Sequence, residues 1–491
     1  MKQGLFYCCL SFMMMGLAIS RLTYLMPWVD EVMFMDTPMH YVKGMGWTTF
    51  AWYSVARQDP FLLYPPLYSM VLALWMNIFG TTLTACRSLN LIITMSIGWG
   101  LLRICRHLGL RMSLMQVGLL VILLWCTDDM MYMYGNGRPD LMGAAILVFA
   151  ISEMISQRNK WPIVFLSVLL LASGIQAVVC LYILLLLAYL ILKDHRERIK
   201  KIALLSVLGT LLGFLLVCTF MACHSHLTAF VVNALSYSNT LMKLAMISLP
   251  VVGDFLGIDT ALYLEKIANN TTDVPIYCRL FMIYTHPAYV SLLVVALFVF
   301  LSERTNLKGT SLYVMMKFLF VCVVLIPLLM NIVGRFPPYY YWMVYLPVFL
   351  LVVILAGFTK SRRNHFIIAL VSLLLVIRGL ICSTQHQDYS ETEMFMAQCS
   401  MLRDKNVVAP FSVFYEMEKL SRYTYYFGVY PPRYLPKDID YVILSPKGSE
   451  YGTNQLYDFY ESINKSDSLQ TVMVAESKTA GLKVYKVIKT L

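Results

Sequence analysis

The sequence predicts a helical protein that crosses a membrane many times and carries a small α/β domain at its C-terminal end. Of its 491 residues 59% are hydrophobic and only 14% are charged, and the mean hydropathy is +0.67. Soluble globular domains are about a quarter charged, so this composition excludes that class. Near residue 384 the long apolar runs stop and alternating helical and strand patterns follow. We therefore predict a transmembrane domain at 1–383 and an extramembrane domain at 384–491.

About eleven apolar runs are candidate membrane spans. They lie at Leu5–Ser20, Thr84–Leu102, Ser113–Cys126, Leu141–Ile155, Trp161–Ser173, Ala177–Leu192, Ile202–Met221, Ala288–Leu301, Leu312–Ile332, Tyr341–Phe358 and Phe366–Cys382. The first run has the length of a signal peptide. It shows no small-x-small cleavage pattern before Arg21, so we expect it to remain as the first span.

The basic residues predict the sidedness of these spans. The formal charge is +11, yet residues 384–491 hold 12 Lys and Arg against 13 Asp and Glu, so the excess lies in membrane loops and does not indicate nucleic acid. The basic excess lies in every second connection between the spans. The basic residues of these connections are Lys2; Arg103, Arg106 and Arg111; Arg158 and Lys160; Lys193, Arg196, Arg198, Lys200 and Lys201; Arg304 and Lys308; Lys360, Arg362 and Arg363. By the positive-inside rule these connections face the cytoplasm. We expect a bacterial inner membrane, a cytoplasmic N-terminus and a periplasmic C-terminal domain.

One apolar segment, Leu67–Phe79, does not fit this alternation as a full span, because it would place Arg103 outside. We interpret it as a juxtamembrane or re-entrant helix of a first outer loop at 21–83. In the C-terminal domain the patterns predict helices near Glu391–Arg403, Val413–Phe427 and Gln455–Asn464 and strands at Asn406–Pro410, Asp440–Leu444, Thr471–Ala475 and Leu482–Val487. No Gly-rich phosphate loop is present there, so nothing supports nucleotide binding.

The first outer loop holds two adjacent acids, Asp30 and Glu31, just beyond the first apolar run. Ionised groups at a membrane surface are costly unless they are used or solvated. A helix cap with solvated acids is the structural alternative. The pair Asp128 and Asp129 could bind a divalent metal ion together with Asp30, although acids in a loop are also often merely solvated.

Three further motifs on the predicted outer side are Tyr64-Pro65-Pro66-Leu67, Gly137-Arg138-Pro139-Asp140 and the aromatic, Pro-rich run from Arg335 to Pro347. In their order and sidedness, together with the first-loop acids, they resemble the C-type fold of membrane glycosyltransferases. The likeness is strongest to the protein O-mannosyltransferases and the lipid A aminoarabinose transferase. Arg138-Pro139-Asp140 also has a structural explanation, because Pro and an acid suit the first turn of a helix.

The resemblance implies transfer of a sugar from a polyprenyl-phosphate donor to a lipid, glycan or protein acceptor, with inversion at the anomeric carbon. It implies that Asp30 is the general base and that Glu31 orients the acceptor or tunes Asp30. Relatives often carry Lys or His where this chain has Tyr64, and a phenol can only hydrogen-bond the lipid phosphate. A cation must then come from another outer residue, or from a divalent metal ion; no other cofactor is expected. Arg335 is our first choice; the other candidates for the cation are His40, Lys43, Arg57 and Arg138. Arg138 or Asp140 is also a candidate for binding the substrate.

Two other functions share this substrate. A transporter or flippase of lipid-linked sugars would also be polytopic, but transporters commonly place ionisable residues or broken helices at the midplane. Here the spans are nearly free of charge and the acids gather at one face. A polymerase or ligase of lipid-linked sugars differs only in its acceptor, and the sequence does not separate it.

Overall fold

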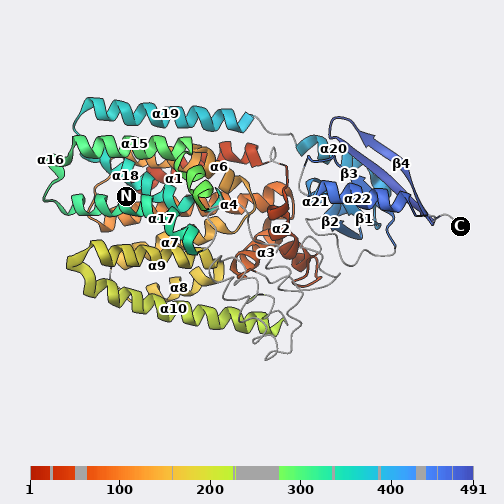
Figure 1. Ribbon diagram of the computed structural model, residues 1–491, viewed down its shortest axis with the longest axis horizontal. Coiled ribbons are helices and arrows are strands. Elements are labelled where there is room, and N and C mark those ends of the chain that lie inside the picture. Colours follow the sequence, from red (N-terminus) through yellow and green to blue (C-terminus); the bar gives the residue numbers. More distant parts are fainter. Residues whose placement is uncertain are drawn as a thin grey trace.

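The computed structural model describes residues 2–22, 26–49, 64–156, 159–224, 276–333, 338–384, 389–426, 438–449, 452–466 and 468–489, together with 227 and 230. A bundle of helices is joined at one end to a small domain that contains a sheet (Figure 1). We call the end of the bundle that faces this domain the domain end.

Each predicted span corresponds to a helix. These helices are α1 (Lys2–Leu22), α4 (Leu83–His107), α5 (Leu114–Cys126), α7 (Asp140–Ser156), α8 (Trp161–Ser173), α9 (Ile175–Ile191), α10 (Arg196–Cys223), α15 (Pro287–Ser302), α17 (Ser311–Val333), α18 (Trp342–Phe358) and α19 (Arg362–Thr384). Within the described part of the chain, five helices are long and apolar enough to cross a membrane alone, and α5 with the following helix, bent by 61°, is a further candidate. The total number of spans remains a prediction.

The helices show which surface faces lipid. On α10 the large apolar side chains Leu204, Leu211 and Leu215 are 60 to 70% exposed. Its opposite face packs on α8 through small residues: a Cβ at Gly209 would lie 2.4 Å from the Val164 carbonyl oxygen. By contrast α18 is apolar and buried almost all round, which places it inside the bundle. The protein is a multi-pass membrane protein with α18 at its core.

Short helices lie at the domain end. They are α2 (Val29–Val42), α3 (Leu67–Phe79), α6 (Asp128–Gly135) and α14 (Ile276–Tyr284). Figure 1 shows α2 and α3 between the bundle and the C-terminal domain. With 13 residues α3 is about 20 Å long, too short to cross the hydrocarbon core alone. The helix α16 (Arg304–Leu307), which lies in a basic connection, is at the opposite end of the bundle (Figure 1).

The C-terminal domain is α/β, as predicted. Its strands β1 (Asn406–Ala409), β2 (Tyr423–Tyr426), β3 (Tyr441–Leu444), β4 (Leu469–Ser477) and β5 (Leu482–Lys489) form one sheet in the order β2-β1-β3-β5-β4. β1 is parallel to β2 and β3, whereas β5 is antiparallel to β3 and β4. The helices are α20 (Tyr389–Gln398), α21 (Phe414–Leu420) and α22 (Thr453–Asn464).

The two faces of this sheet have different neighbours. Val408 and Val442 pack with Leu456 and Ile463 of α22, whereas Val407 and Ile443 belong to the large core that includes α21 and the bundle. Burial on both faces explains why the parallel strands are continuous apolar runs.

One predicted element of the domain is wrong. The helix expected at Val413–Phe427 ends at Leu420, and the next segment is the strand β2. β2 is the sequence Tyr-Thr-Tyr-Tyr, aromatic and β-branched residues that favour a pleated surface, and it pairs in parallel with β1. The strand propensity of these four residues is the sequence signal that distinguishes β2 from the predicted helix.

Candidate functional site

The two first-loop acids belong to the first turn of α2, where the positive end of the helix dipole favours carboxylates. They nevertheless lie in different environments. The side chain of Asp30 is 29% exposed, whereas that of Glu31 is completely buried. Consecutive helical residues point about 100° apart, so one faces an open region and the other faces the protein interior.

Arg138 holds Asp30 in place. One terminal nitrogen of the guanidinium, Nη1, donates to Oδ2 of Asp30, and Nε donates to Oδ2 of Asp140 at 2.7 Å. Burial lowers the pKa of Arg138, but the attraction of Asp140 and Asp30 outweighs it and raises this pKa well above its ordinary value. The guanidinium is therefore a permanent cation between two carboxylates, of which Asp30 is the exposed one.

Aromatic rings surround the same guanidinium. Its Cζ atom lies 3.6 Å from the ring centroid of Tyr339, 5.3 Å from that of Phe34 and 5.6 Å from that of Trp28. Tyr64 packs edge-on against Phe34, with 4.9 Å between ring centroids. The rings contribute cation–π attraction and confine Arg138 to one orientation.

The turn before α7 explains the Gly-Arg-Pro-Asp motif. A Cβ at Gly137 would lie 1.7 Å from Cε of Met35 and 3.3 Å from Cγ of Glu31, so a larger residue would require the Met35 side chain to move. The side-chain amide of Asn90 on α4 donates to the carbonyl oxygens of Asn136 at 2.6 Å and Arg138 at 3.1 Å. The motif thus positions Arg138 against Asp30 as well as starting α7.

Glu31 does not have the surroundings expected of a residue that touches an acceptor. Arg87 of α4 donates from Nε and Nη2 to the two carboxylate oxygens of Glu31, each at 2.6 Å. Tyr415 of α21 donates to the same carboxylate at 3.2 Å, and burial raises the pKa of this phenol well above its ordinary value, which keeps it a donor. Glu31 therefore joins α2, α4 and the C-terminal domain. That it orients the acceptor or tunes Asp30 stays a prediction.

Arg87 and Tyr415 were not singled out from the sequence. A signal existed for Arg87, because it is a charged residue inside a long apolar run and such residues usually have a partner. Nothing local marks Tyr415, one of 32 tyrosines.

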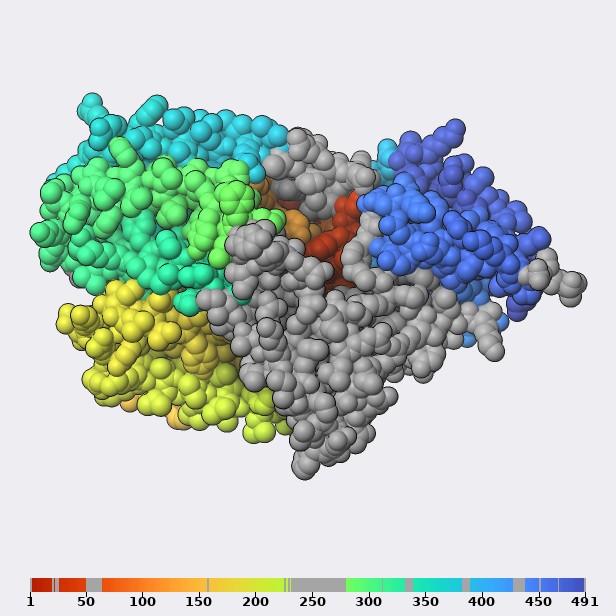
Figure 2. Space-filling view, in the orientation of Figure 1, coloured from red at the N-terminus to blue at the C-terminus, as the bar shows by residue number. Residues whose placement is uncertain are grey.

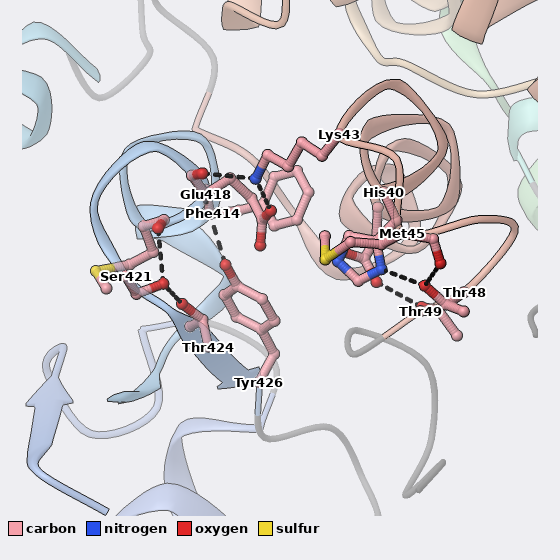
Figure 3. A network of polar contacts seen from close by, with 12 residues as sticks. His40, Lys43, Met45, Thr48, Thr49, Phe414, Glu418, Ser421, Thr424 and Tyr426 are labelled. Carbon is pink, nitrogen blue, oxygen red and sulfur yellow. Dashed lines mark hydrogen bonds and ion pairs between the residues drawn. The ribbon is translucent and has the colours of Figure 1, made fainter. Parts of the chain in front are cut away.

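His40, a candidate for binding the substrate, lies in the interior. Its side chain is 1% exposed, with Nε2 at 3.3 Å from Oδ1 of Asp36 and Nδ1 at 3.0 Å from Oγ1 of Thr48. It is buried inside a polar cluster and does not face an open substrate site. Lys43, a further candidate, binds Glu418 of α21 (Figure 3).

The acids proposed for a metal ion have separate partners. Asp128 accepts from Nε of Arg378 at 2.6 Å, and Asp129 accepts from the hydroxyl of Tyr345. Among the residues that the structure describes, Asp30, Asp128 and Asp129 do not converge as a donor group. Arg57 and Arg335 lie outside the described residues.

The molecular surface is hollowed between the bundle and the C-terminal domain (Figure 2). Figure 2 shows red and orange atoms, from the N-terminal part of the chain, at the bottom of a recess between the helices of the bundle and the blue C-terminal domain.

Comparison with known proteins gives structural matches only, since no family model and no curated protein matches the sequence. The structure of ArnT from Cupriavidus metallidurans bound to undecaprenyl phosphate is similar with a TM-score of 0.63 at 10% identity, over 98% of this chain and 97% of that one. The oligosaccharyltransferase of Archaeoglobus fulgidus tethered with an acceptor peptide gives 0.52 at 10% identity, over 99% and 74%. AglB from the same organism, in complex with an inhibitory peptide and a dolichol-phosphate, gives 0.50 at 11% identity, over 89% and 69%. At these identities the likeness establishes the fold, and the protein has the C-type fold of polytopic membrane glycosyltransferases.

Proposed function

We propose that this protein is a glycosyltransferase that moves a sugar from a polyprenyl-phosphate-linked donor to a lipid, glycan or protein acceptor. The shared fold supports this class, since the similar ArnT structure holds undecaprenyl phosphate. We place the reaction at the domain end, on the outer face of a bacterial inner membrane, with the N-terminus in the cytoplasm. The basic connections at the opposite end support this orientation.

The observation that carries the proposal is the environment of Asp30. Glu31 and Asp36 are fully buried, and the side chain of Asp140 is 9% exposed, whereas that of Asp30 is 29% exposed. Asp30 is thus the carboxylate of this group that an acceptor can reach. Its carboxylate is oriented by Arg138, and an accessible, oriented carboxylate is the group that a general base requires.

The reaction then follows from these groups. The acceptor hydroxyl gives its proton to Asp30 as its oxygen forms a bond to the anomeric carbon, and the bond from that carbon to the phosphate oxygen breaks with inversion. The polyprenyl phosphate leaves with the electron pair. After the transfer Asp30 is neutral, and Arg138 keeps its second partner, Asp140.

The leaving phosphate needs a cation, and we assign this role to Arg335. Tyr339, which stacks on Arg138, follows Arg335 by only four residues. A planar guanidinium binds two phosphate oxygens at once, which Tyr64 cannot do.

The test is Asp30→Asn, which keeps size and hydrogen bonding and removes basicity. Sugar transfer from a polyprenyl-phosphate donor in reconstituted membranes should fall roughly 10²–10⁴-fold with donor binding nearly unchanged. Asp458→Asn, at an exposed position of α22, is the matched control and should be fully active. Near-normal transfer by folded Asp30→Asn protein would refute the assignment. Loss of folded protein in gel filtration would instead show that the Asp30 ion pair is structural.

A further inference from the structure

The interior of the bundle contains an apolar cavity that the proposed reaction does not use. Its volume is about 220 Å³, and all of its lining residues are hydrophobic. They come from the helices α4, α7, α9, α17 and α18. An apolar cavity of roughly 150 Å³ stays dry and binds benzene, so this larger one can hold part of a hydrocarbon chain.

The cavity lies away from the proposed reaction. On α4 its lining runs from Leu101 to Leu108. Asn90 of the same helix, which binds the turn before α7, lies about 16 Å nearer the domain end than Leu101 does. The end of the cavity that faces the domain end is closed by Trp342 and Met343, each 2% exposed. A donor lipid at the domain end is therefore separated from the cavity by buried side chains.

The cavity opens toward the opposite end of the bundle. Leu108, which follows α4, lines the cavity and is 39% exposed. Leu192, at the end of α9, and Met315, near the start of α17, also line it and are partly exposed. Along α18 the lining extends from Trp342 to Ile354, about 18 Å, against about 15 Å for half of the hydrocarbon core of a membrane. The cavity thus has the length of a lipid chain from the leaflet at that end.

Basic side chains surround this opening. Arg198 donates from Nη2 to the carbonyl oxygen of Ile155 at 3.0 Å, and Ile155 lines the cavity. Lys193 is exposed and directly follows the last lining residue of α9. Residues 103–113 hold three Arg and no acid, and residues 192–201 hold five Lys or Arg against two acids. Basic pockets between membrane-spanning helices bind the head groups of anionic lipids, so the charge at the opening suits a lipid phosphate.

We propose that the cavity binds one acyl chain of an anionic phospholipid, such as phosphatidylglycerol, from the leaflet at the opposite end. In the proposed orientation this is the cytoplasmic leaflet. The lipid phosphate pairs with Lys193, with Arg198 and with Arg111, which is three residues after Leu108. The chain fills space in which the side chains of α17 and α18 would otherwise lack partner atoms. This role is structural and does not depend on glycosyl transfer.

The test uses the tryptophan at the inner end of the cavity. Full-length protein is placed in nanodiscs of phosphatidylcholine with an increasing fraction of phosphatidylglycerol that carries bromine near the ends of its acyl chains. Bromine quenches tryptophan at contact, and Trp342 is 2% exposed, so a quenching chain must enter the cavity to reach it. The emission that wild type shows above Trp342→Phe should fall as brominated phosphatidylglycerol is added. Brominated phosphatidylcholine at the same fraction should leave this emission unchanged.

Further variants separate the chain from the head group. Leu184→Phe narrows the cavity partway along α9 and should abolish the quenching, whereas Leu186→Phe, at a position that is 52% exposed on the same helix, should not. Lys193→Gln and Arg111→Gln should each raise the lipid fraction needed for half quenching about 5-fold, because each removes one attraction for the phosphate. Lys308→Gln, exposed at the same end in another connection, is the matched control and should bind like wild type.

Three results would overturn the proposal. Unquenched Trp342 in wild type would show that no chain enters the cavity, and equal quenching by the two brominated lipids would show that no anionic head group is selected. Recovery of the emission by undecaprenyl phosphate, but not by unbrominated phosphatidylglycerol, would assign the cavity to the donor tail. If Leu184→Phe or Trp342→Phe is not recovered folded, the two lipids compared on wild type and on Lys193→Gln decide the test. Sugar transfer is not measured, so failure here leaves the proposed function untouched.

Discussion

Glu31 and Arg87, 56 residues apart in the chain, form a two-contact ion pair in which both side chains are completely buried. Arg87 also donates from Nη1 to the carbonyl oxygen of Leu22 at the end of α1. With Tyr415, this pair connects the first span, α2, α4 and the C-terminal domain. The acid next to the proposed base is thus part of the framework that holds α2.

We expect Glu31→Gln to reduce stability, because it leaves the buried Arg87 without a compensating charge. Removing one partner of a buried pair costs about 3–5 kcal/mol. The matched control is Glu153→Gln, whose partner Arg103 is 32% exposed, and which should cost at most about 1 kcal/mol. The measurement is thermal unfolding in detergent. Equal unfolding temperatures for the two variants would contradict a structural role for Glu31. The double variant Glu31→Gln with Arg87→Met should recover part of the stability that Glu31→Gln loses, because it also removes the unpaired charge.

Gly137→Ala should separate the turn before α7 from α2. The added Cβ meets Met35 and Glu31, and overpacking of this kind typically costs about 1–3 kcal/mol. Because Arg138 is the next residue, its contact with Asp30 should loosen and sugar transfer should fall more than the folded yield does. Gly118→Ala is the control, since its Cβ would lie 4.0 Å from the nearest atom, on Phe6. If Gly137→Ala transfers sugar as fast as the Gly118→Ala control, the close approach of the Gly137 turn to α2 is not needed for activity.

Arg335→Ala should weaken binding of a polyprenyl-phosphate donor, and Arg335→Lys should recover only part of it because the bidentate geometry is lost. Donor affinity measured with a fluorescent lipid phosphate is the readout. Arg304→Ala, in the basic connection at the opposite end, should bind the donor like wild type. Should both Arg335 variants bind normally, the role would pass to Arg138.

The orientation of the chain predicts which cysteines a membrane-impermeant reagent can reach. In a background without the native cysteines, Ser449→Cys in an exposed turn of the C-terminal domain should be labelled in intact cells. Lys308→Cys, exposed at the opposite end, should react only after permeabilisation. The reverse pattern would place the Asp30 site in the cytoplasm.

The sequence by itself determined the positions of the bundle helices and most of the C-terminal domain. A long apolar run of near-uniform hydropathy specifies a helix in lipid whatever its neighbours are, because its backbone must bond internally. The alternation in β5 and the turn before it are likewise local. The same pattern predicts that Asp30 and Arg138 lie on the outer side, because the positive-inside rule assigns the basic loops to the cytoplasm.

Only the tertiary structure decided what these polar groups contact. Asp30 meets Arg138 across 108 residues, and Glu31 meets Tyr415 across 384. Asp30 and Glu31 are adjacent in the sequence, yet Asp30 is partly exposed and Glu31 is buried. The difference arises because α2 packs only one of its faces on α4 and the C-terminal domain. Likewise His40 looks from its sequence like a cation at the membrane surface, yet it is buried beside Asp36 and Glu418. Which face of a short helix is covered depends on how distant helices pack, and no local pattern records it.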